Sequence, residues 1–152
     1  MSIYLKIEEA ISTNDYESIL AELSDTFSEL EATSQNLVMG IYENPEEAYK
    51  LMLRSTGYWE QLQAVYSTLD TIKSNREKVY VQKRKMEIES DPKGKFVVSA
   101  VEGEAVASTV DLRRLRNIVE SYMHMADKNI MVCQSFLKYV TESQKRSVNQ
   151  EG

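Results

Sequence analysis

Hydrophobic residues recur along residues 44–90 at alternating steps of four and three, the spacing of a heptad repeat on an α-helix. The positions of the repeat are Leu51, Ser55, Tyr58, Leu62, Val65, Leu69, Ile72, Arg76, Val79, Lys83 and Met86. Asn44 and Pro45 are typical of a helix start, and Pro92 and Gly94 of a stop. The pattern predicts one helix of about 70 Å at roughly 1.5 Å per residue. Its second half contains arginine and lysine, which argues against burial there.

Two further helices are predicted before this one. Residues 3–11 form a short amphipathic pattern, and residues 16–41 repeat the steps of four and three before fraying near Gly40. Asn14 and Glu17 have the spacing of a capping box, so we expect Asn14 to cap the second helix. Only a short connection then leads to the long helix.

The C-terminal part predicts a third major helix with a wide apolar surface. It begins at about Glu104 or Thr109 and ends at Glu142. Residues 91–104 are interpreted as a connector in which 95–99 have the composition of a short edge strand. The polar residues 144–152 are expected to form a flexible tail.

The predicted fold class is all-α, a long antiparallel helical hairpin or coiled-coil bundle that is oligomeric. It comprises an acidic N-terminal helical arm (1–43), a hairpin core (44–143) and the tail. Gly40 and Pro45 leave open a kinked rod instead of a hairpin. The polar positions in the repeat are compatible with several subunit numbers.

Charge is segregated along the chain. Of the 152 residues, 18 are basic and 24 acidic, a formal net charge of −6. Residues 1–47 hold one basic and eleven acidic residues, or 1 − 11 = −10, and the remainder holds 17 − 13 = +4. Such asymmetry indicates a polyanion-binding face or a charged interaction arm. The acidic arm is either a solvated face or a segment that occupies the basic groove until DNA or a basic partner displaces it.

Composition indicates a folded cytoplasmic protein, in the host cytoplasm if a phage encodes it. Hydrophobic residues make up 42%, no apolar run is long enough to span a membrane, and no secretion signal is apparent at the N-terminus. The single cysteine, Cys133, lies on an apolar stripe and is expected to be a small buried hydrophobe.

Sequence signatures of enzymes are missing, including phosphate-binding glycine loops, His-x-x-x-His, cysteine pairs and a nucleophile elbow. The only histidine, His124, is interpreted as an ordinary helical residue, with a pH-responsive contact as the alternative. The Glu-x-Glu pairs at 87/89 and 102/104 point to different helix faces. We therefore expect no enzyme, no cofactor and no metal site.

One segment combines basic and aromatic residues. Its cations, set against the acids Glu77, Glu87, Glu89 and Asp91, are Lys73, Arg76, Lys78, Lys83, Arg84, Lys85, Lys93 and Lys95, with Tyr80 among them. Single-stranded nucleic acid needs cations for its phosphates and flat side chains for its bases, each stacked base contributing about 1–3 kcal/mol. A solvated charged face is the alternative.

A second basic cluster, Arg113, Arg114 and Arg116, starts the third helix. Across the connector it is predicted to converge with the first cluster at one end of the molecule. Arginines at a helix start are unfavourable to its dipole, a cost that an approaching anion would relieve. The cations are expected to hold phosphates and Tyr80 to stack on a base.

Residues 45–142 resemble the UvsY-type recombination mediators of tailed phages. In that family a basic residue precedes paired tyrosines and a basic glycine-containing loop, and a long C-terminal helix follows a further connector. Arg76 and Tyr80 fall on the basic and second tyrosine positions, whereas Val79 replaces the first tyrosine and the glycine is delayed to Gly94. Residues 130–139 are similar to the C-terminal helix of many small phage recombination proteins.

The resemblance implies a non-enzymatic, ring-forming protein that binds single-stranded DNA. Its implied partners are a RecA-like recombinase and a single-strand-binding protein, and the ring would multiply weak basic sites. The competing hypothesis is a structural or adaptor coiled-coil protein, a virion component or assembly chaperone, without nucleic-acid binding. The sequence leaves open the protein partners and a preference for DNA or RNA.

Overall fold

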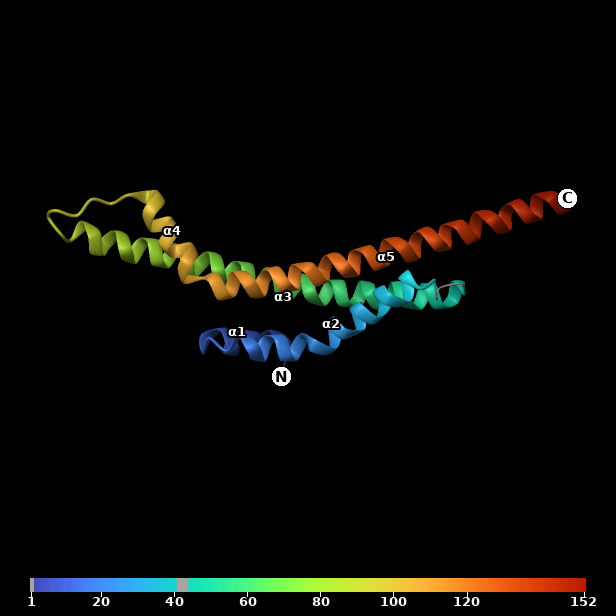
Figure 1. The fold of residues 1–152 in the computed structure, drawn as a ribbon, viewed down its shortest axis with the longest axis horizontal. Coiled ribbons are helices and arrows are strands. Elements are labelled where there is room, and N and C mark those ends of the chain that lie inside the picture. The colour runs from blue at the N-terminus through green and yellow to red at the C-terminus, as the bar shows by residue number, and fades with distance from the viewer. Residues whose placement is uncertain (1, 41–43) are drawn as a thin grey trace. The chain divides into compact units, whose positions relative to one another are not determined.

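The computed structural model describes residues 2–40 and 44–152, and these contain five helices and no strand (Figure 1). The helices are α1 (Ile3–Ser12), α2 (Tyr16–Val38), α3 (Pro45–Glu89), α4 (Val98–Ser108) and α5 (Val110–Glu151). The predicted all-α class is confirmed. In the described part of the chain, no helix combines the length and the apolar character needed to cross a membrane.

The predicted bounds of the long helix are correct to within one residue at each end. The side-chain oxygen of Asn44 accepts a hydrogen bond from the backbone N–H of Glu46 at 3.0 Å, which caps α3. After the helix, the N–H of Gly94 donates to the carbonyl oxygen of Asp91 at 2.8 Å. A Cβ on Gly94 would clash with the carbonyl oxygen of Ile88, so this turn requires glycine.

The turn between α1 and α2 differs from the prediction by one residue. Asn14 adopts a left-handed backbone conformation (φ 56°), and the N–H groups of Asn14 and Asp15 donate back to Ile11 and Ala10. This Schellman arrangement ends α1, so Asn14 cannot also cap α2. Asp15 caps α2 instead, accepting from the N–H of Ser18 at 3.2 Å. The predicted end of α2 at Ile41 lies outside the described residues.

The sequence left open whether residues 95–99 form a strand, and the structure shows none there. The connector expected at 91–104 is wrong in its extent. Residues 90–97 form a shorter irregular link, and α4 begins at Val98. Val101, Ala105 and Thr109 are buried at steps of four, so helix formation places all three on one face. A lone strand would have left its backbone groups without a ladder partner.

The third major helix begins at Val110, after a break at Thr109, and continues to Glu151. The expected end at Glu142 is therefore wrong, because residues 143–151 continue the helix. The flexibility expected for 144–152 stays a prediction. The sequence from Val110 to Glu151 contains neither proline nor glycine, so nothing local stops the helix. Residues 141–152 are all exposed.

Contacts group the chain into two compact units. Unit 1 comprises Met1–Leu20 and Val65–Val119, and unit 2 comprises Ala21–Ala64 and Glu120–Gly152. The division at residues 43 and 143, inferred from sequence, stays a prediction.

Unit 1 buries one face of every helix that enters it. Its buried apolar residues are Ile7, Ala10, Ile11, Ile19, Val65, Leu69, Val101, Ala105, Leu112, Leu115 and Val119. The apolar face of α3 ends within this unit, since Val79 and Met86 are exposed. The expectation that the second half of the α3 repeat is not buried is thus correct for Val79, Lys83 and Met86, whereas Arg76 is half-buried. Lys73, outside the repeat, is buried.

Unit 2 packs α2, α3 and α5 through apolar and polar contacts, which include an exposed ion pair between Arg54 and Glu29 and a hydrogen bond from Tyr122 to Glu31. Phe27 stacks on Tyr122, with ring centroids 3.9 Å apart and planes 12° apart. The hydroxyl of Ser34 donates to the side-chain oxygen of Asn129 at 2.9 Å. Cys133 is fully buried beside Leu37 and Leu51, which confirms its expected role.

We expect Leu62→Ala to lower the free energy of unfolding by about 2–5 kcal/mol, because this fully buried α3 side chain would leave a cavity. Leu53→Ala is the matched control, since Leu53 lies on the same helix in the same unit and is 52% exposed. Urea denaturation followed by far-UV circular dichroism measures both. Equal losses for the two variants would contradict the burial pattern of α3.

Candidate nucleic-acid interface

The structure places all twelve candidate residues in unit 1. Those from Lys73 to Lys85 lie on α3, Lys93 and Lys95 lie on the link, and the arginines of the second cluster lie in the first two turns of α5. Two of these arginines contact α3, Arg116 at Asp70 and Arg113 at Glu77. The two clusters meet at Asp70, which contacts both Lys73 and Arg116, so the predicted convergence involves the start of the first cluster. Lys93 and Lys95 lie on the link, which α4 separates from α5 in the chain.

Asp70 joins two of the candidate cations. Its carboxylate lies 2.9 Å from a guanidinium nitrogen of Arg116 and 3.1 Å from Nζ of Lys73. Hydrogen bonds from Arg116 and then Lys73 hold the pKa of Asp70 below its usual value. Lys73 is buried, so it and Arg116 serve the packing of α3 against α5.

Glu77 on α3 binds residues at the start of α5, as Asp70 does. Its carboxylate accepts hydrogen bonds from Nη2 and Nε of Arg113 at 2.6 and 2.9 Å, and from the hydroxyl of Thr109 at 2.6 Å. Burial alone would raise the pKa of Glu77, but these hydrogen bonds and the nearby positive charges lower it overall. Arg113 is thereby committed to an internal contact at the break between α4 and α5.

Arg76 binds the end of α1. Its guanidinium donates to the carbonyl oxygen of Ile11 at 2.9 Å and to the hydroxyl of Tyr16 at 3.2 Å. A cation at a helix C-terminus satisfies free carbonyl groups and interacts favourably with the helix dipole. Arg76 therefore fixes α1 on α3, a role that the sequence did not reveal.

Tyr80 and Arg84 share one acid on α4. The Tyr80 hydroxyl and Nε of Arg84 each donate to the same oxygen of Glu104 at 3.1 Å. Arg84 also reaches Glu87 at 3.3 Å. The hydrogen bond to Glu104 raises the pKa of Tyr80, since it is lost when the phenol ionises beside the carboxylate.

Lys85 makes two weaker contacts. Its ammonium lies 3.9 Å from Glu89 and 5.7 Å from the centroid of the Phe96 ring. Both Lys85 and Glu89 are more than half exposed, and ion pairs of that kind contribute at most about 1 kcal/mol. A ligand phosphate can replace such a contact at little cost.

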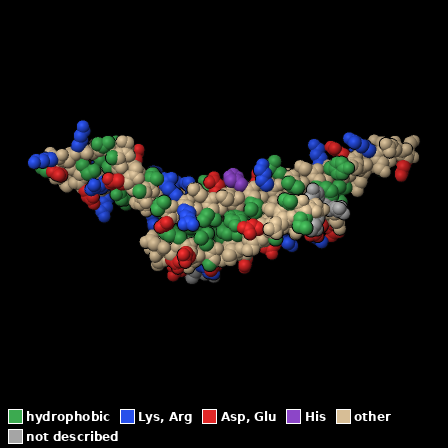
Figure 2. Space-filling view, in the orientation of Figure 1, with side chains coloured by type: hydrophobic (Ala, Val, Ile, Leu, Met, Phe, Trp, Pro, Cys, Tyr) green, Lys and Arg blue, Asp and Glu red, His purple; other side chains and the backbone are tan. Residues whose placement is uncertain are grey.

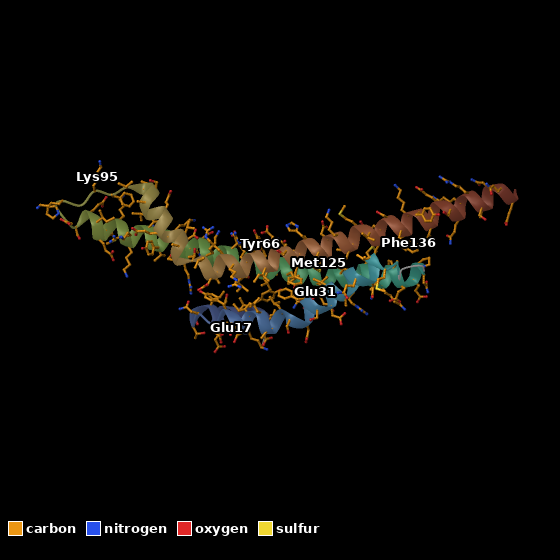
Figure 3. The ribbon with its side chains drawn as sticks, in the orientation of Figure 1. Glu17, Glu31, Tyr66, Lys95, Met125 and Phe136 are labelled. Carbon is orange, nitrogen blue, oxygen red and sulfur yellow. The ribbon has the colours of Figure 1, made fainter. Side chains whose placement is uncertain are left out.

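Four exposed lysines surround the C-terminal end of α3 and the link, namely Lys78, Lys83, Lys93 and Lys95. None of them forms an ion pair with an acid elsewhere in residues 2–40 and 44–152. Figure 3 shows Lys95 extending from the link, and Figure 2 shows blue side chains interspersed with red ones there, at the left of the view.

A groove of about 580 Å³ lies between α3 and α4 and includes Lys78 in its lining, with Val81, Glu102 and Val106. Arg114 lines a different cleft, of about 460 Å³, together with Asp15, Glu17 and Asp111. Arg114 therefore does not belong to the lysine group.

His124 is exposed on α5. Within the described ranges, no three His, Cys, Asp or Glu side chains are placed to hold a metal ion. Comparison with known proteins gave no match to a family model, to a curated protein or to a solved structure.

Sequence reasoning counted Glu77, Glu87 and Glu89 against the candidate cations but missed Asp70 and Glu104, and it did not show which cation each acid binds. The spacing of three residues between Asp70 and Lys73 was a usable signal, because such residues are neighbours on a helix. Glu104 and Glu77 gave no such signal, since their partners are 20 to 36 residues away in sequence.

We expect the free energy of unfolding to fall as the pH drops below about 4, because Asp70 and Glu77 have lowered pKa values in the folded state. The stabilisation is present above the unfolded-state pKa and is lost as the pH falls through the folded-state pKa. Glu77→Gln should lower the urea midpoint at pH 7 and make its fall towards pH 3 shallower. Glu102→Gln, which alters an exposed acid on α4, should leave both unchanged.

Proposed function

We propose that this protein is a non-enzymatic single-stranded-DNA-binding recombination mediator that acts in the cytoplasm. The observation that supports the proposal best is the group of four exposed lysines around the end of α3, which is next to the aromatic residues Tyr80 and Phe96. Lysines bind phosphates as mobile point charges, and an aromatic ring can stack on a base. The binding residues would be Lys78, Lys83, Lys85, Lys93 and Lys95. Tyr80 and Arg84 would be secondary binding residues, because both donate hydrogen bonds to Glu104.

The charge of this region indicates weak binding by a single chain. Residues 78–104 contain six cations and five acids, so their net charge is 6 − 5 = +1. Affinity for a strand rises with the number of phosphates that are neutralised together. A mediator of this kind would need several copies of the chain on one strand, and avidity would then supply the affinity.

We propose that α5 supplies the contact between copies. Along one face of this helix, a shallow apolar depression of about 510 Å³ is lined by Lys128, Met131, Val132, Ser135, Phe136 and Tyr139. Met131 is 48% exposed and Tyr139 is 68% exposed, so part of this face is open in the single chain. Helices that pair through this face would form a coiled-coil oligomer. We also propose that the long helices form an antiparallel hairpin.

In the proposed mechanism, an oligomer wraps or bends the strand without nucleotide hydrolysis. It loosens the single-strand-binding protein and offers a RecA-like recombinase a prepared start for its filament. The recombinase and the single-strand-binding protein are proposed partners, inferred from the resemblance to UvsY-type mediators.

Titration of a fluorescein-labelled oligothymidylate tests the proposal by fluorescence anisotropy. Binding should weaken steeply between about 50 and 200 mM salt, because counterions are released. Lys83→Glu with Lys95→Glu should reduce affinity at least about tenfold and lower the magnitude of the salt slope by about 1.4, since each lost phosphate contact removes roughly 0.7.

Lys138→Glu with Lys145→Glu is the matched control, because it makes the same charge change at exposed positions on α5. This variant should keep most of the affinity. If the wild-type chain does not bind the oligonucleotide, or if both double variants weaken it equally, the lysine group is not the binding site.

We expect Met131→Lys with Tyr139→Lys to reduce the molar mass measured by light scattering to that of a single chain, because buried lysines would separate the paired faces. Leu5→Lys with Leu53→Lys makes the same charge change at exposed apolar residues elsewhere and should leave the mass unchanged. A single-chain mass for the wild type would rule out this assembly.

The second candidate function is a structural or adaptor protein without nucleic-acid binding. It is favoured by the ion pairs of Lys73, Arg84, Lys85, Arg113 and Arg116 with carboxylates, which reduce the charge available to a polyanion. Such a protein would associate through α5 and ignore the oligonucleotide, so the two measurements above separate the candidates.

A further inference from the structure

Glu104 on α4 occupies two groups that a bound phosphate would use. We infer that this carboxylate is an internal competitor of the nucleic-acid backbone and thereby sets the affinity of the lysine-rich end of unit 1. The inference rests on the proposed function, because it concerns the regulation of the same site.

The geometry of the contact is that of an anion site. Tyr80 and Arg84 lie four residues apart on α3, so their side chains leave the same face of the helix. Both donate to a single oxygen of Glu104, each at 3.1 Å. A phosphate oxygen accepts the same two hydrogen bonds as a carboxylate oxygen, so ligand and side chain would compete for the same donors.

The surroundings keep the carboxylate in place and also leave it replaceable. Val101 and Ala105 are buried, which fixes the part of α4 that carries Glu104. The side chains of Arg84 and Glu104 are 41% and 42% exposed, so an incoming phosphate can reach the pair. Displacing Glu104 then requires rotation of one side chain and leaves α4 where it is.

The cations next to this contact would guide the strand towards it. Lys83 and Lys85 flank Arg84 in sequence and are both exposed. Arg84 retains a second acid, Glu87, at 3.3 Å, so its charge stays partly compensated after Glu104 leaves. Removal of Glu104 alone should therefore increase affinity moderately and should not create a new site.

The test compares Glu104→Gln with Glu102→Gln in the oligothymidylate titration, using the full chain. Both variants remove one negative charge from α4, but the side chain of Glu102 forms no ion pair or hydrogen bond within the described residues. Glu104→Gln should bind about fivefold more tightly than wild type, the upper range for an exposed ion pair, and Glu102→Gln less than about twofold. Glu104→Asp keeps the charge but shortens the reach, and should also bind more tightly than wild type.

A second measurement reports the contact without nucleic acid. Glu104→Gln keeps an acceptor oxygen but removes the negative charge beside the phenol, which weakens the hydrogen bond and should lower the pKa of Tyr80. Ultraviolet titration of this variant should therefore show one tyrosine ionising earlier than in wild type. Glu102→Gln should titrate like wild type. Circular dichroism and thermal unfolding establish that each variant is folded.

The possible outcomes separate the two hypotheses. If wild type binds and Lys83→Glu with Lys95→Glu weakens it, but Glu104→Gln binds no more tightly than Glu102→Gln, the competitor role is wrong and the proposed function stands. If neither wild type nor Glu104→Gln binds, both are wrong. Tighter binding by Glu104→Gln and Glu104→Asp, but not by Glu102→Gln, supports the inference.

Discussion

The carboxylates of Asp70 and Glu77 hold unit 1 together at the place where the apolar face of α3 ends. They lie seven residues apart and bind Arg116 and Arg113 of α5, so the two antiparallel helices are fixed in one register. Glu77 also accepts the hydroxyl of Thr109, which fixes the break between α4 and α5. Removing one member would leave a partly buried charge without its partner, and that loss usually costs more than the intact pair contributes.

This use of charge limits what unit 1 can offer to a polyanion. The arginines with the best geometry for binding phosphate are bound to internal acids or, for Arg76, to the end of α1. The cations that stay open are lysines on the last turns of α3 and on the link, beyond Glu77. The cations that serve packing and the cations that stay open are thus different residues along one helix, and few stay open in a single chain.

In unit 2 the ion pair between α2 and α3, Arg54 with Glu29 at 3.9 Å, is more than half exposed, so uncharged contacts contribute more to its packing. Its interhelical contacts include the stacked rings of Phe27 and Tyr122 and the neutral pair of Ser34 and Asn129. Neutral polar pairs specify register without the desolvation cost of buried ions. The apolar face of α5 continues past these contacts and stays partly exposed at Met131 and Tyr139, whereas the exposed side chains of unit 1 include the four lysines.

The sequence by itself determined the all-α class, the bounds of α3 and the buried role of Cys133, because heptad spacing and helix-end residues such as Asn44 act over a few neighbouring positions. It did not determine α4, because apolar residues near its start are also compatible with a strand. In the structure the helix buries Val101 and Ala105 on one face. Only the tertiary structure decided which cations are free, because Glu77 and Glu104 meet partners that are 20 to 36 residues away. Electrostatic pairing depends on distance in space, and residue order along the chain does not record it.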